Sequence, residues 1–405
     1  MRHLPPTFTA MTETANANDF LLDFWTATPE VFWAFVFFVF GSVVGSFLNV
    51  CIHRMPLEQS LIRPPSQCPK CRFAIPWHLN MPIISWLMLR GKCKQCAEPI
   101  SPRYIGVEIL TGLAFLACWL TFGNQSTPGV LLAVTWSLVL AGLITATFID
   151  FEHFIIPDEI TLGGVAVGFL VSAALPSLHE AESATASLTA SGLGILVGGG
   201  SVLAVLQLGK WFFGKTRVPL EENETAIFTE TALHLPGEVA PYEDIFFRNS
   251  DTLRFHAKRL ELIDRCHTDI DVALSPKRLL IGEESFDPES VPYLKVDTDE
   301  MVIPREAMGF GDVKFMAGIG AFVGWQGALF SLMASAVVGA AVGVSLLAIG
   351  RKDWSDRLPY GPYISLAAVI WIFFGQEIVD AWLPGPAPMP ALPPLGQAGL
   401  EQPRL

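Results

Sequence analysis

Two short stretches, far apart in the chain, place aspartates where a carboxylate is costly. Asp312 closes a Gly-Phe-Gly-Asp stretch and directly precedes an apolar run, whereas Asp150 ends another long apolar run. Ionisable side chains at such positions in membrane proteins usually mark functional sites. Asp312 is also compatible with a purely structural role as the N-cap of the helix that follows it.

A pair of carboxylates suggests a specific chemistry. Two carboxylates brought close together at a partly dry interface cannot both ionise cheaply, so one keeps its proton while the other activates a water molecule. This is how an aspartic protease works, without a metal ion or a nucleophilic side chain. Serine and cysteine mechanisms fit poorly, because no histidine lies within a plausible nucleophile motif. The sequence therefore predicts Asp150 and Asp312 as a catalytic pair.

The other acidic residues near these runs favour structural interpretations. Asp158 follows a proline and is predicted to be the N-cap of the next helix. Glu152 and His153 are predicted to be interfacial and solvated. Glu108 lies near the start of a further apolar run, where it either pairs with a basic loop residue or shapes a polar cavity.

The cysteines point to a metal site. Four of the seven form two Cys-x-x-Cys pairs separated by 21 residues, namely Cys68, Cys71, Cys93 and Cys96. This spacing is typical of a closed, tetrahedral, structural zinc site in a loop with little core of its own. Two surface pairs without metal, or a redox pair, are the alternatives. The remaining thiols are predicted to be inert, and they are Cys51, Cys118 and Cys266.

Composition defines the class of protein. The 405-residue chain is 51% hydrophobic with a mean hydropathy of +0.44, which indicates an integral membrane protein. A net charge of −13 without a basic stripe argues against nucleic-acid binding. The apolar runs predict an all-α polytopic fold of about eight transmembrane helices, with a short sixth helix followed by a turn at Gly324–Gly327. The predicted segments are 31–52, 106–122, 129–149, 160–175, 192–213, 313–323, 328–349 and 364–382.

These segments divide the chain into parts. Residues 53–105 form a loop rich in Lys and Arg, so the positive-inside rule places this loop in the cytoplasm and the N-terminus outside. The predicted parts are an extracytoplasmic tail (1–30), the first transmembrane helix (31–52), the cytoplasmic cysteine loop (53–105), helices two to five with Asp150 (106–214), a soluble insertion (215–306), the Gly-x-Gly-Asp motif with helices six to eight (307–383), and an unfolded Pro-rich tail (384–405).

The insertion differs in kind from the membrane part. It holds 20 Asp and Glu residues against 11 Lys and Arg, and it contains no run long enough to span a bilayer. Short strands are predicted at 269–274, 278–281 and 292–296, which indicates a small cytoplasmic α+β or mainly β unit. The charge also fits a disordered segment, but the aromatic and aliphatic content argues against disorder.

Several motifs together resemble the bacterial type IV prepilin peptidases. They are the runs Gly41–Pro56, Ser101–Leu110, Asp150–Asp158, Gly309–Lys314 and Tyr360–Tyr363, together with the cysteine loop, and they occur in the order of that family. The resemblance covers about residues 31–214 and 306–383. The chain departs from the family pattern at Arg72 and Ala97, where glycine usually follows each second cysteine, and in its long insertion.

The resemblance implies an activity and a location. It assigns catalysis to Asp150 and Asp312, and it implies cleavage of the leaders of prepilins and pseudopilins at the cytoplasmic face of the bacterial inner membrane. It also implies N-methylation of the new N-terminus with S-adenosylmethionine, for which no Gly-rich nucleotide-binding βαβ unit is visible in the sequence. The alternatives are another Gly-x-Gly-Asp intramembrane protease and a proton-coupled transporter, which would place its carboxylates mid-membrane and show internal repeats.

Overall fold

The computed structural model describes residues 29–382, apart from 125, 214, 221–224, 237, 247–250, 305–308 and 351–357. The predicted tails 1–30 (all but its last two residues) and 384–405 lie outside the described residues. The chain divides into two compact units, of which one comprises residues up to Gly198 and from Phe315 onward, and the other comprises Gly199–Lys314.

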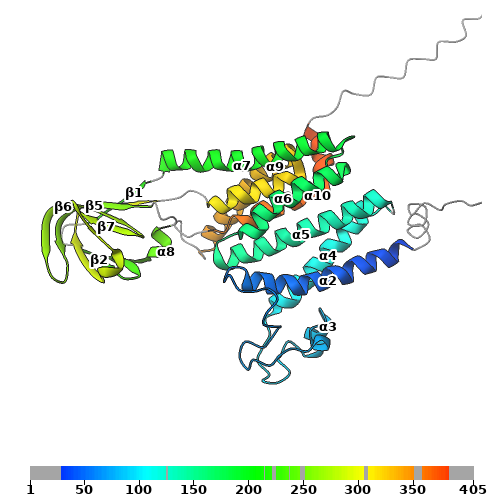
Figure 1. Cartoon of the computed structure of the whole chain (residues 1–405), viewed down its shortest axis with the longest axis horizontal. Helices are drawn as coiled ribbons and strands as arrows, with labels where there is room; N and C mark the ends of the chain where they lie inside the picture. The colour runs from blue at the N-terminus through cyan, green and yellow to red at the C-terminus, as the bar shows by residue number, and fades with distance from the viewer. Residues whose placement is uncertain are drawn as a thin grey trace, which may run out of the picture. The chain divides into compact units, whose positions relative to one another are not determined.

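Long helices dominate the first unit and run alongside one another (Figure 1). They are α2 (Glu30–Arg54), α4 (Pro102–Phe122), α5 (Thr127–His153), α6 (Asp158–Ala174), α7 (Ala184–Phe213), α9 (Phe310–Ala348) and α10 (Gly361–Trp382). In the described part of the chain, six of them are long and apolar enough to cross a membrane, and α6 has only 17 residues. The eight predicted segments thus correspond to these seven labelled helices of a multi-pass membrane protein, because α9 joins two helical segments across a kink.

The predicted break between two helices at Gly324–Gly327 is confirmed at its first residue. Two helical segments meet there within α9, and Gly324 between them has φ 71° and ψ −177°. These angles are open to glycine almost alone. The break is therefore a sharp kink at Gly324 and not a four-residue turn, and Trp325 begins the second helical segment of α9.

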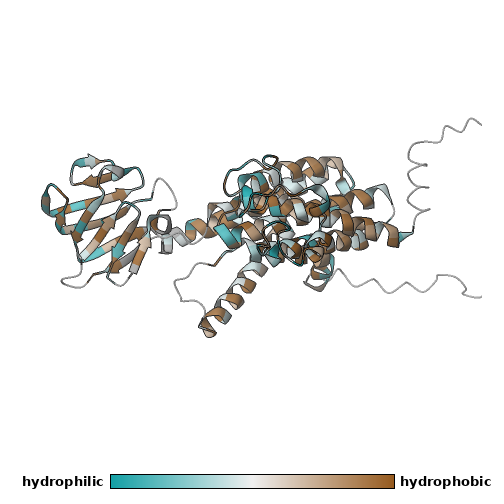
Figure 2. Ribbon diagram, turned by 90° about the horizontal axis from the view of Figure 1, so that it is seen from below, coloured by the Kyte–Doolittle hydropathy of each residue, from teal (hydrophilic) through white to brown (hydrophobic). Residues whose placement is uncertain are grey.

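The helices bury small faces against one another and leave apolar residues on the outside (Figure 2). α2, α4 and α5 pack together, and α10 packs against α5. A Cβ atom at Gly45 of α2 would lie 2.8 Å from the Cα of Glu108 in α4, so the two backbones approach closely there. Such small-residue contacts are typical of helix packing in lipid, where apolar burial supplies little driving force.

Short elements follow α2 in the cysteine loop. They are the 3₁₀ turn η1 (Trp77–Leu79) and the helix α3 (Ile84–Met88), and a second 3₁₀ turn, η2 (Pro176–His179), lies between α6 and α7. The cysteine loop also contains two isolated antiparallel bridges, Gln67 with Ala74 and Lys92 with Pro99. Each bridge closes the backbone around one Cys-x-x-Cys pair.

The insertion is a β-rich unit, as the composition predicted. Its strands are β1 (Lys215–Pro219), β2 (Thr225–Thr229), β3 (Ala232–Leu235), β4 (Glu238–Pro241), β5 (Leu253–Glu261), β6 (Cys266–Ser275), β7 (Arg278–Ile281), β8 (Glu284–Phe286), β9 (Tyr293–Asp297) and β10 (Glu300–Pro304), with the four-residue helix α8 (Tyr242–Ile245) and the 3₁₀ turn η3 (Pro288–Ser290). The three strand predictions are confirmed by β6, β7 and β9.

The β unit has its own core and a simple connection to the membrane part. Its main path runs β4-β3-β2-β9-β5-β6-β7-β8, and β10 pairs with β5 and β1. Buried residues including Phe228, Phe255 and Leu260 form one cluster. The first and last strands pair antiparallel, with Lys215 opposite Pro304, so the chain enters and leaves the unit at the same place.

Candidate functional site

Asp150 lies in the last turn of α5 and is buried, with 5% of its surface exposed. Its Oδ2 accepts a hydrogen bond of 2.8 Å from the backbone N–H of Gly361, the first residue of α10. A helix N-terminus presents unpaired N–H groups and partial positive charge to an anion. The start of α10 therefore holds this carboxylate in one orientation.

Gly361 is required by this contact. A Cβ atom at this position would lie 2.8 Å from the Asp150 Oδ2 atom and 3.2 Å from Ile156. Gly361 belongs to the Tyr-Gly-Pro-Tyr motif at residues 360–363. The sequence does not predict its role, because a backbone contact over 211 positions leaves no local signal.

Asp312 lies in the first turn of α9 and is also buried, with 9% exposed. The helix begins at Phe310, so Asp312 is its third residue and the simple N-cap interpretation is wrong. Its backbone N–H donates to the carbonyl oxygen of Gly309. Asp150 and Asp312 fall in separate units of the chain.

The remaining acidic predictions have mixed outcomes. Pro157 occupies the N-cap position of α6 and Asp158 is the first helical residue, so the predicted cap is wrong by one position. Acidic residues in a first turn are still favourable there. Glu152 forms an ion pair with Arg103 at the start of α4, which ties α5 to the end of the cysteine loop.

The four loop cysteines come together, as their spacing predicted. Their sulfur atoms all lie within 4.8 Å of one another. Cys68 and Cys96 are 3.7 Å apart, and Cys71 and Cys93 are 3.9 Å apart. A zinc ion bound at about 2.3 Å by four tetrahedral thiolates would separate the sulfurs by about 3.8 Å. The cluster therefore fits this ion in both ligand type and spacing.

The backbone around the cysteines supports thiolates. N–H groups of Cys71 and Lys70 lower the pKa of Cys68, and N–H groups of Cys96 and Gln95 lower that of Cys93 to about 6. Thiolates are the metal-binding form of cysteine. Each pair thus supplies at least one sulfur that the backbone prepares for a cation.

The two departures from the family pattern adopt the backbone that glycine would favour. Arg72 has φ 56° and Ala97 has φ 57°, in the left-handed region. Each donates its N–H to the carbonyl of the first cysteine of its own pair, at 2.9 and 3.0 Å. The two turns therefore form without glycine, at a cost of about 1 kcal/mol each.

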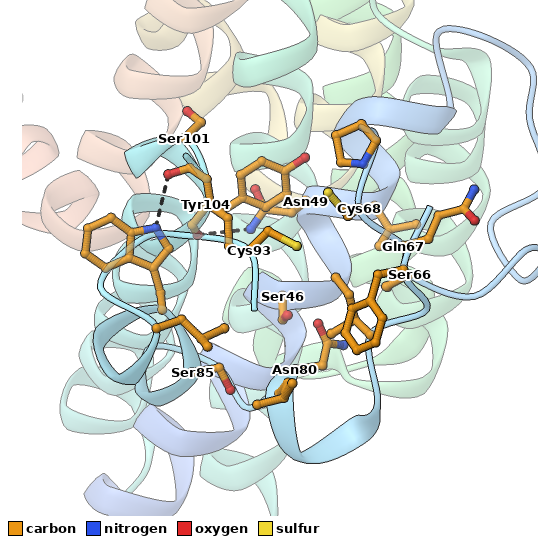
Figure 3. A pocket seen from close by; sticks show the side chains of 18 of the residues that line it. Ser46, Asn49, Ser66, Gln67, Cys68, Asn80, Ser85, Cys93, Ser101 and Tyr104 are labelled. Carbon is orange, nitrogen blue, oxygen red and sulfur yellow. Dashed lines mark hydrogen bonds between the residues drawn. The ribbon is translucent and has the colours of Figure 1, made fainter. Parts of the chain in front are cut away.

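A cavity of about 610 Å³ lies between the cysteine loop, α2 and α4 (Figure 3). Glu108 lines it and is 8% exposed. Its Oε2 accepts a hydrogen bond of 2.7 Å from the N–H of Ile83. Of the two interpretations left open for Glu108, this arrangement bears out the polar cavity. Cys51 and Cys118 are buried and Cys266 is exposed.

The fold and these sites define a multi-pass membrane protein with buried aspartates at helix ends and a four-cysteine loop. A family model for the bacterial peptidase A24 N-terminal domain matches residues 39–122, and one for the type IV leader peptidase family matches 137–216 and 290–344. The chain is 34% identical to a prepilin leader peptidase/N-methyltransferase of Klebsiella pneumoniae over 42% of this chain and 75% of that protein. The chain belongs to the type IV leader peptidase family.

Other relatives extend the similarity. A protein of the same name from Aeromonas hydrophila is 26% identical over 90% of this chain and 98% of its own length. Another from Myxococcus xanthus is 43% identical over 35% of this chain and 40% of its own length. No solved structure matches the chain.

Proposed function

We propose that this protein is a membrane aspartic endopeptidase that removes the leader peptides of type IV prepilins and pseudopilins and then N-methylates the new N-terminus. It acts in the bacterial inner membrane, with its active site facing the cytoplasm. Membership of the leader peptidase family and the names of its relatives support both activities. The observation that carries the assignment of Asp150 is its burial together with the backbone bond from Gly361.

Asp150 and Asp312 form the catalytic pair in this proposal. One carboxylate, ionised, takes a proton from a water molecule, and the resulting hydroxide attacks the scissile carbonyl carbon. The other, protonated, donates to the carbonyl oxygen and stabilises the tetrahedral intermediate. Burial of both side chains supports the sharing of one proton, because two charged carboxylates in a dry site repel each other strongly.

Replacing each aspartate by asparagine tests this assignment. Asp150→Asn and Asp312→Asn keep the size of the side chain but remove the carboxyl group that can lose or donate a proton. We expect each to lower the rate of leader cleavage by a factor of about 10⁴ or more, measured with purified, zinc-loaded protein and a prepilin. Asp158→Asn is the matched control and should cleave at close to the normal rate. Substantial cleavage by either mutant would remove that residue from the catalytic pair.

The four cysteines hold a structural zinc ion in this proposal, and the ion fixes the loop without taking part in peptide hydrolysis. The tetrahedral spacing of the sulfurs supports it. Elemental analysis should find about one zinc per chain, and Cys71→Ser combined with Cys96→Ser should abolish it. Purified unmutated protein without zinc would contradict this assignment.

The methyl donor in this proposal is S-adenosylmethionine, which supplies an electrophilic methyl group on a positively charged sulfur. The relatives' names carry the methyltransferase activity. The N-terminal amine exposed by cleavage is the acceptor, so peptide hydrolysis must precede methylation. Incubation with a prepilin should therefore show leader loss first and methyl incorporation second.

A further inference from the structure

The start of α10 offers its backbone N–H groups in an unusual way. Tyr360 directly precedes the helix, at a position where a Ser, Thr, Asp or Asn side chain would usually accept from the first turn. Pro362 has no N–H group, and the N–H of Tyr363 donates to the carbonyl oxygen of Tyr360 at 3.1 Å. Among the first three helical positions, the N–H that reaches another helix is therefore that of Gly361, which donates to Asp150 at 2.8 Å.

Asp150 acts as a cap for α10 from the end of α5. A carboxylate oxygen that accepts from a first-turn N–H is a common capping arrangement, but here the two residues are 211 positions apart. The bond between Asp150 and Gly361 exists only while the first turn of α10 stays at the end of α5. Helix ends fray easily, so the orientation of the carboxylate depends on whatever holds this turn in place.

Small residues on the second helical segment of α9 hold this turn. Ser335 and Gly339 are four residues apart, so they lie on one face of the helix. A Cβ atom at Gly339 would lie 3.2 Å from the ring of Tyr363 and 3.6 Å from the ring of Tyr360. Both rings therefore pack directly on the backbone of α9, which is the kind of close approach that small residues permit between helices in lipid.

Tyr360 also forms a directional bond at this contact. Its hydroxyl oxygen lies 3.0 Å from the Oγ atom of Ser335, a residue with no exposed surface. The Ser335 hydroxyl donates its single hydrogen to the carbonyl oxygen of Leu332 at 2.8 Å, so Tyr360 is the donor and Ser335 the acceptor. Packing alone would let the ring slide along α9, whereas this bond fixes it at one place.

We propose that Tyr360 is a positioning residue of the peptidase site, because its bond to Ser335 fixes the start of α10 and thereby directs the Gly361 N–H at Asp150. The inference rests on the proposed peptidase function, in which Asp150 is one of the two catalytic carboxylates. Tyr360 acts through the backbone of its neighbour and takes no part in proton transfer. Since α9 carries Asp312 in its first turn, this helix is connected to both carboxylates, to one through its own chain and to the other through Tyr360.

Loss of this bond should affect turnover rather than substrate binding. Without it the first turn of α10 moves more freely, so Asp150 spends less time in the reactive orientation, and small displacements of a catalytic group are costly. Tyr360→Phe and Ser335→Ala should each lower kcat for leader cleavage about five- to tenfold, the effect of losing one hydrogen bond, with KM nearly unchanged. A residue that only stabilises the fold would lower the unfolding temperature and leave kcat of the folded protein normal.

A double variant and two matched controls sharpen this test. Both substitutions remove the same bond, so the protein that carries both should lose no more activity than the more impaired single variant. Tyr293→Phe makes the same change at an exposed tyrosine of the insertion. Ser345→Ala removes an exposed hydroxyl of α9 that donates to the carbonyl oxygen of Ala341 in its own helix, at 2.7 Å. Both controls should cleave with normal kcat.

Steady-state cleavage of a prepilin by the full-length protein in detergent gives kcat and KM. The unfolding temperature and the zinc content show whether each variant is folded, and Ser335→Ala tests the same bond if Tyr360→Phe does not fold. Normal kcat in either folded single variant, or a double variant whose loss is the product of the two single losses, would overturn the inference.

Hydrogen exchange tests the unmutated protein without any substitution. The backbone N–H of Gly361 should exchange slowly with solvent, because it is bonded within a fixed turn, and rapid exchange would overturn the inference as well. If the unmutated protein does not cleave prepilin, the proposed peptidase function is wrong instead, and if Asp150→Asn cleaves normally, the assignment of Asp150 is wrong.

Discussion

At the scale of single residues, the proposed peptidase site depends on one backbone N–H group as well as on carboxylates. Asp150 is fixed by the N–H of Gly361, a residue with no side chain to contribute. A side chain at position 361 would press on the carboxylate oxygen at 2.8 Å. In the proposed mechanism the glycine is therefore a positioning residue, since its N–H orients the carboxylate.

Gly361→Ala should lower leader cleavage by about tenfold or more, because displacing a catalytic group by less than 1 Å is costly. We expect the loss mainly in kcat, since substrate contacts elsewhere are unchanged. Steady-state cleavage assays measure the two constants separately. Gly142→Ala, on the same helix as Asp150 and with open space around its Cα, is the control and should retain normal kcat. Equal rates for Gly361→Ala and the unmutated protein would show that this contact does not position Asp150.

The cysteine loop stores strain at two residues, and this strain can be removed. Arg72→Gly and Ala97→Gly should remove the strain of a left-handed backbone at φ 56° and φ 57°. The greater freedom of glycine in the unfolded chain offsets part of this gain in stability. Each change should raise zinc affinity about two- to fivefold, measured by competition with a chelator. Lys94→Gly, in the same turn as Ala97 but without positive φ, should lower the affinity. Weaker zinc binding in both glycine variants would contradict a strained turn.

At the scale of elements, the first half of α9 is held by glycines on two neighbouring helices. A Cβ atom at Gly194 of α7 would overlap the backbone of Gly320 in α9, and one at Gly168 of α6 would lie 2.7 Å from Ala321. Ser191 of α7 also donates to the carbonyl oxygen of Ala321 at 2.9 Å. α9 begins with the turn that carries Asp312, so this packing fixes the helix that holds the second aspartate.

Gly194→Ala should therefore destabilise the helix bundle, by about 1–3 kcal/mol, since overpacking forces the two backbones apart. The unfolding temperature of the detergent-solubilised protein is measured first. Leader cleavage is then assayed as a second measurement. Gly192→Ala lies two residues earlier in the same helix, on the other side, and has open space, so it should unfold at the normal temperature. An unchanged unfolding temperature for Gly194→Ala would show that α7 and α9 are not in close contact at this point.

Much of the helical fold could be predicted from the sequence, because long apolar runs have few alternatives in a membrane. The predicted segment 129–149 lies inside α5 (Thr127–His153), and 31–52 lies inside α2. The start of α4 was set four residues too late, although Ser101 accepts the N–H of Arg103 and Pro102 follows it. That cap is a recognisable signal for the start of a helix, but a prediction based on hydropathy alone passes over it because the first turn is polar.

The sites were predictable only in part, for a physical reason. Motif and residue type identified the two aspartates and the four cysteines, since carboxyl and thiol groups are recognisable from the sequence as groups that can do chemistry. The partners of Asp150 and Glu108 are backbone N–H groups of Gly361 and Ile83, which tertiary packing alone brings close.

At the scale of the whole molecule, the β-rich insertion lies in a compact unit of its own. Its buried cluster is formed from its own strands. The type IV leader peptidase family model leaves residues 217–289 unmatched, which is most of the insertion. The surplus of acidic residues there accounts for most of the chain's net charge of −13. Such a surface would attract a basic leader peptide at low ionic strength.

The paired strands at its base allow the insertion to be removed cleanly. Arg217 of β1 lies opposite Val302 of β10, and neighbouring strands lie about 5 Å apart. Replacing Arg217–Val302 by a short Gly/Ser linker should therefore close the chain with little strain and little loop entropy. The membrane part retains Asp150, Asp312 and the four cysteines, so kcat for leader cleavage should persist at saturating substrate.

Any effect of this deletion should appear in substrate binding. The loss of an acidic surface should raise KM at low salt and make KM less sensitive to salt, because screening weakens long-range attraction between charges. Cleavage is measured at two ionic strengths with a prepilin and with a variant whose leader lacks its basic residues, which should respond little to the deletion. Complete loss of turnover by a folded, zinc-loaded deletion protein would mean that the insertion belongs to the catalytic machinery, and that the boundaries at 215 and 306 are wrong.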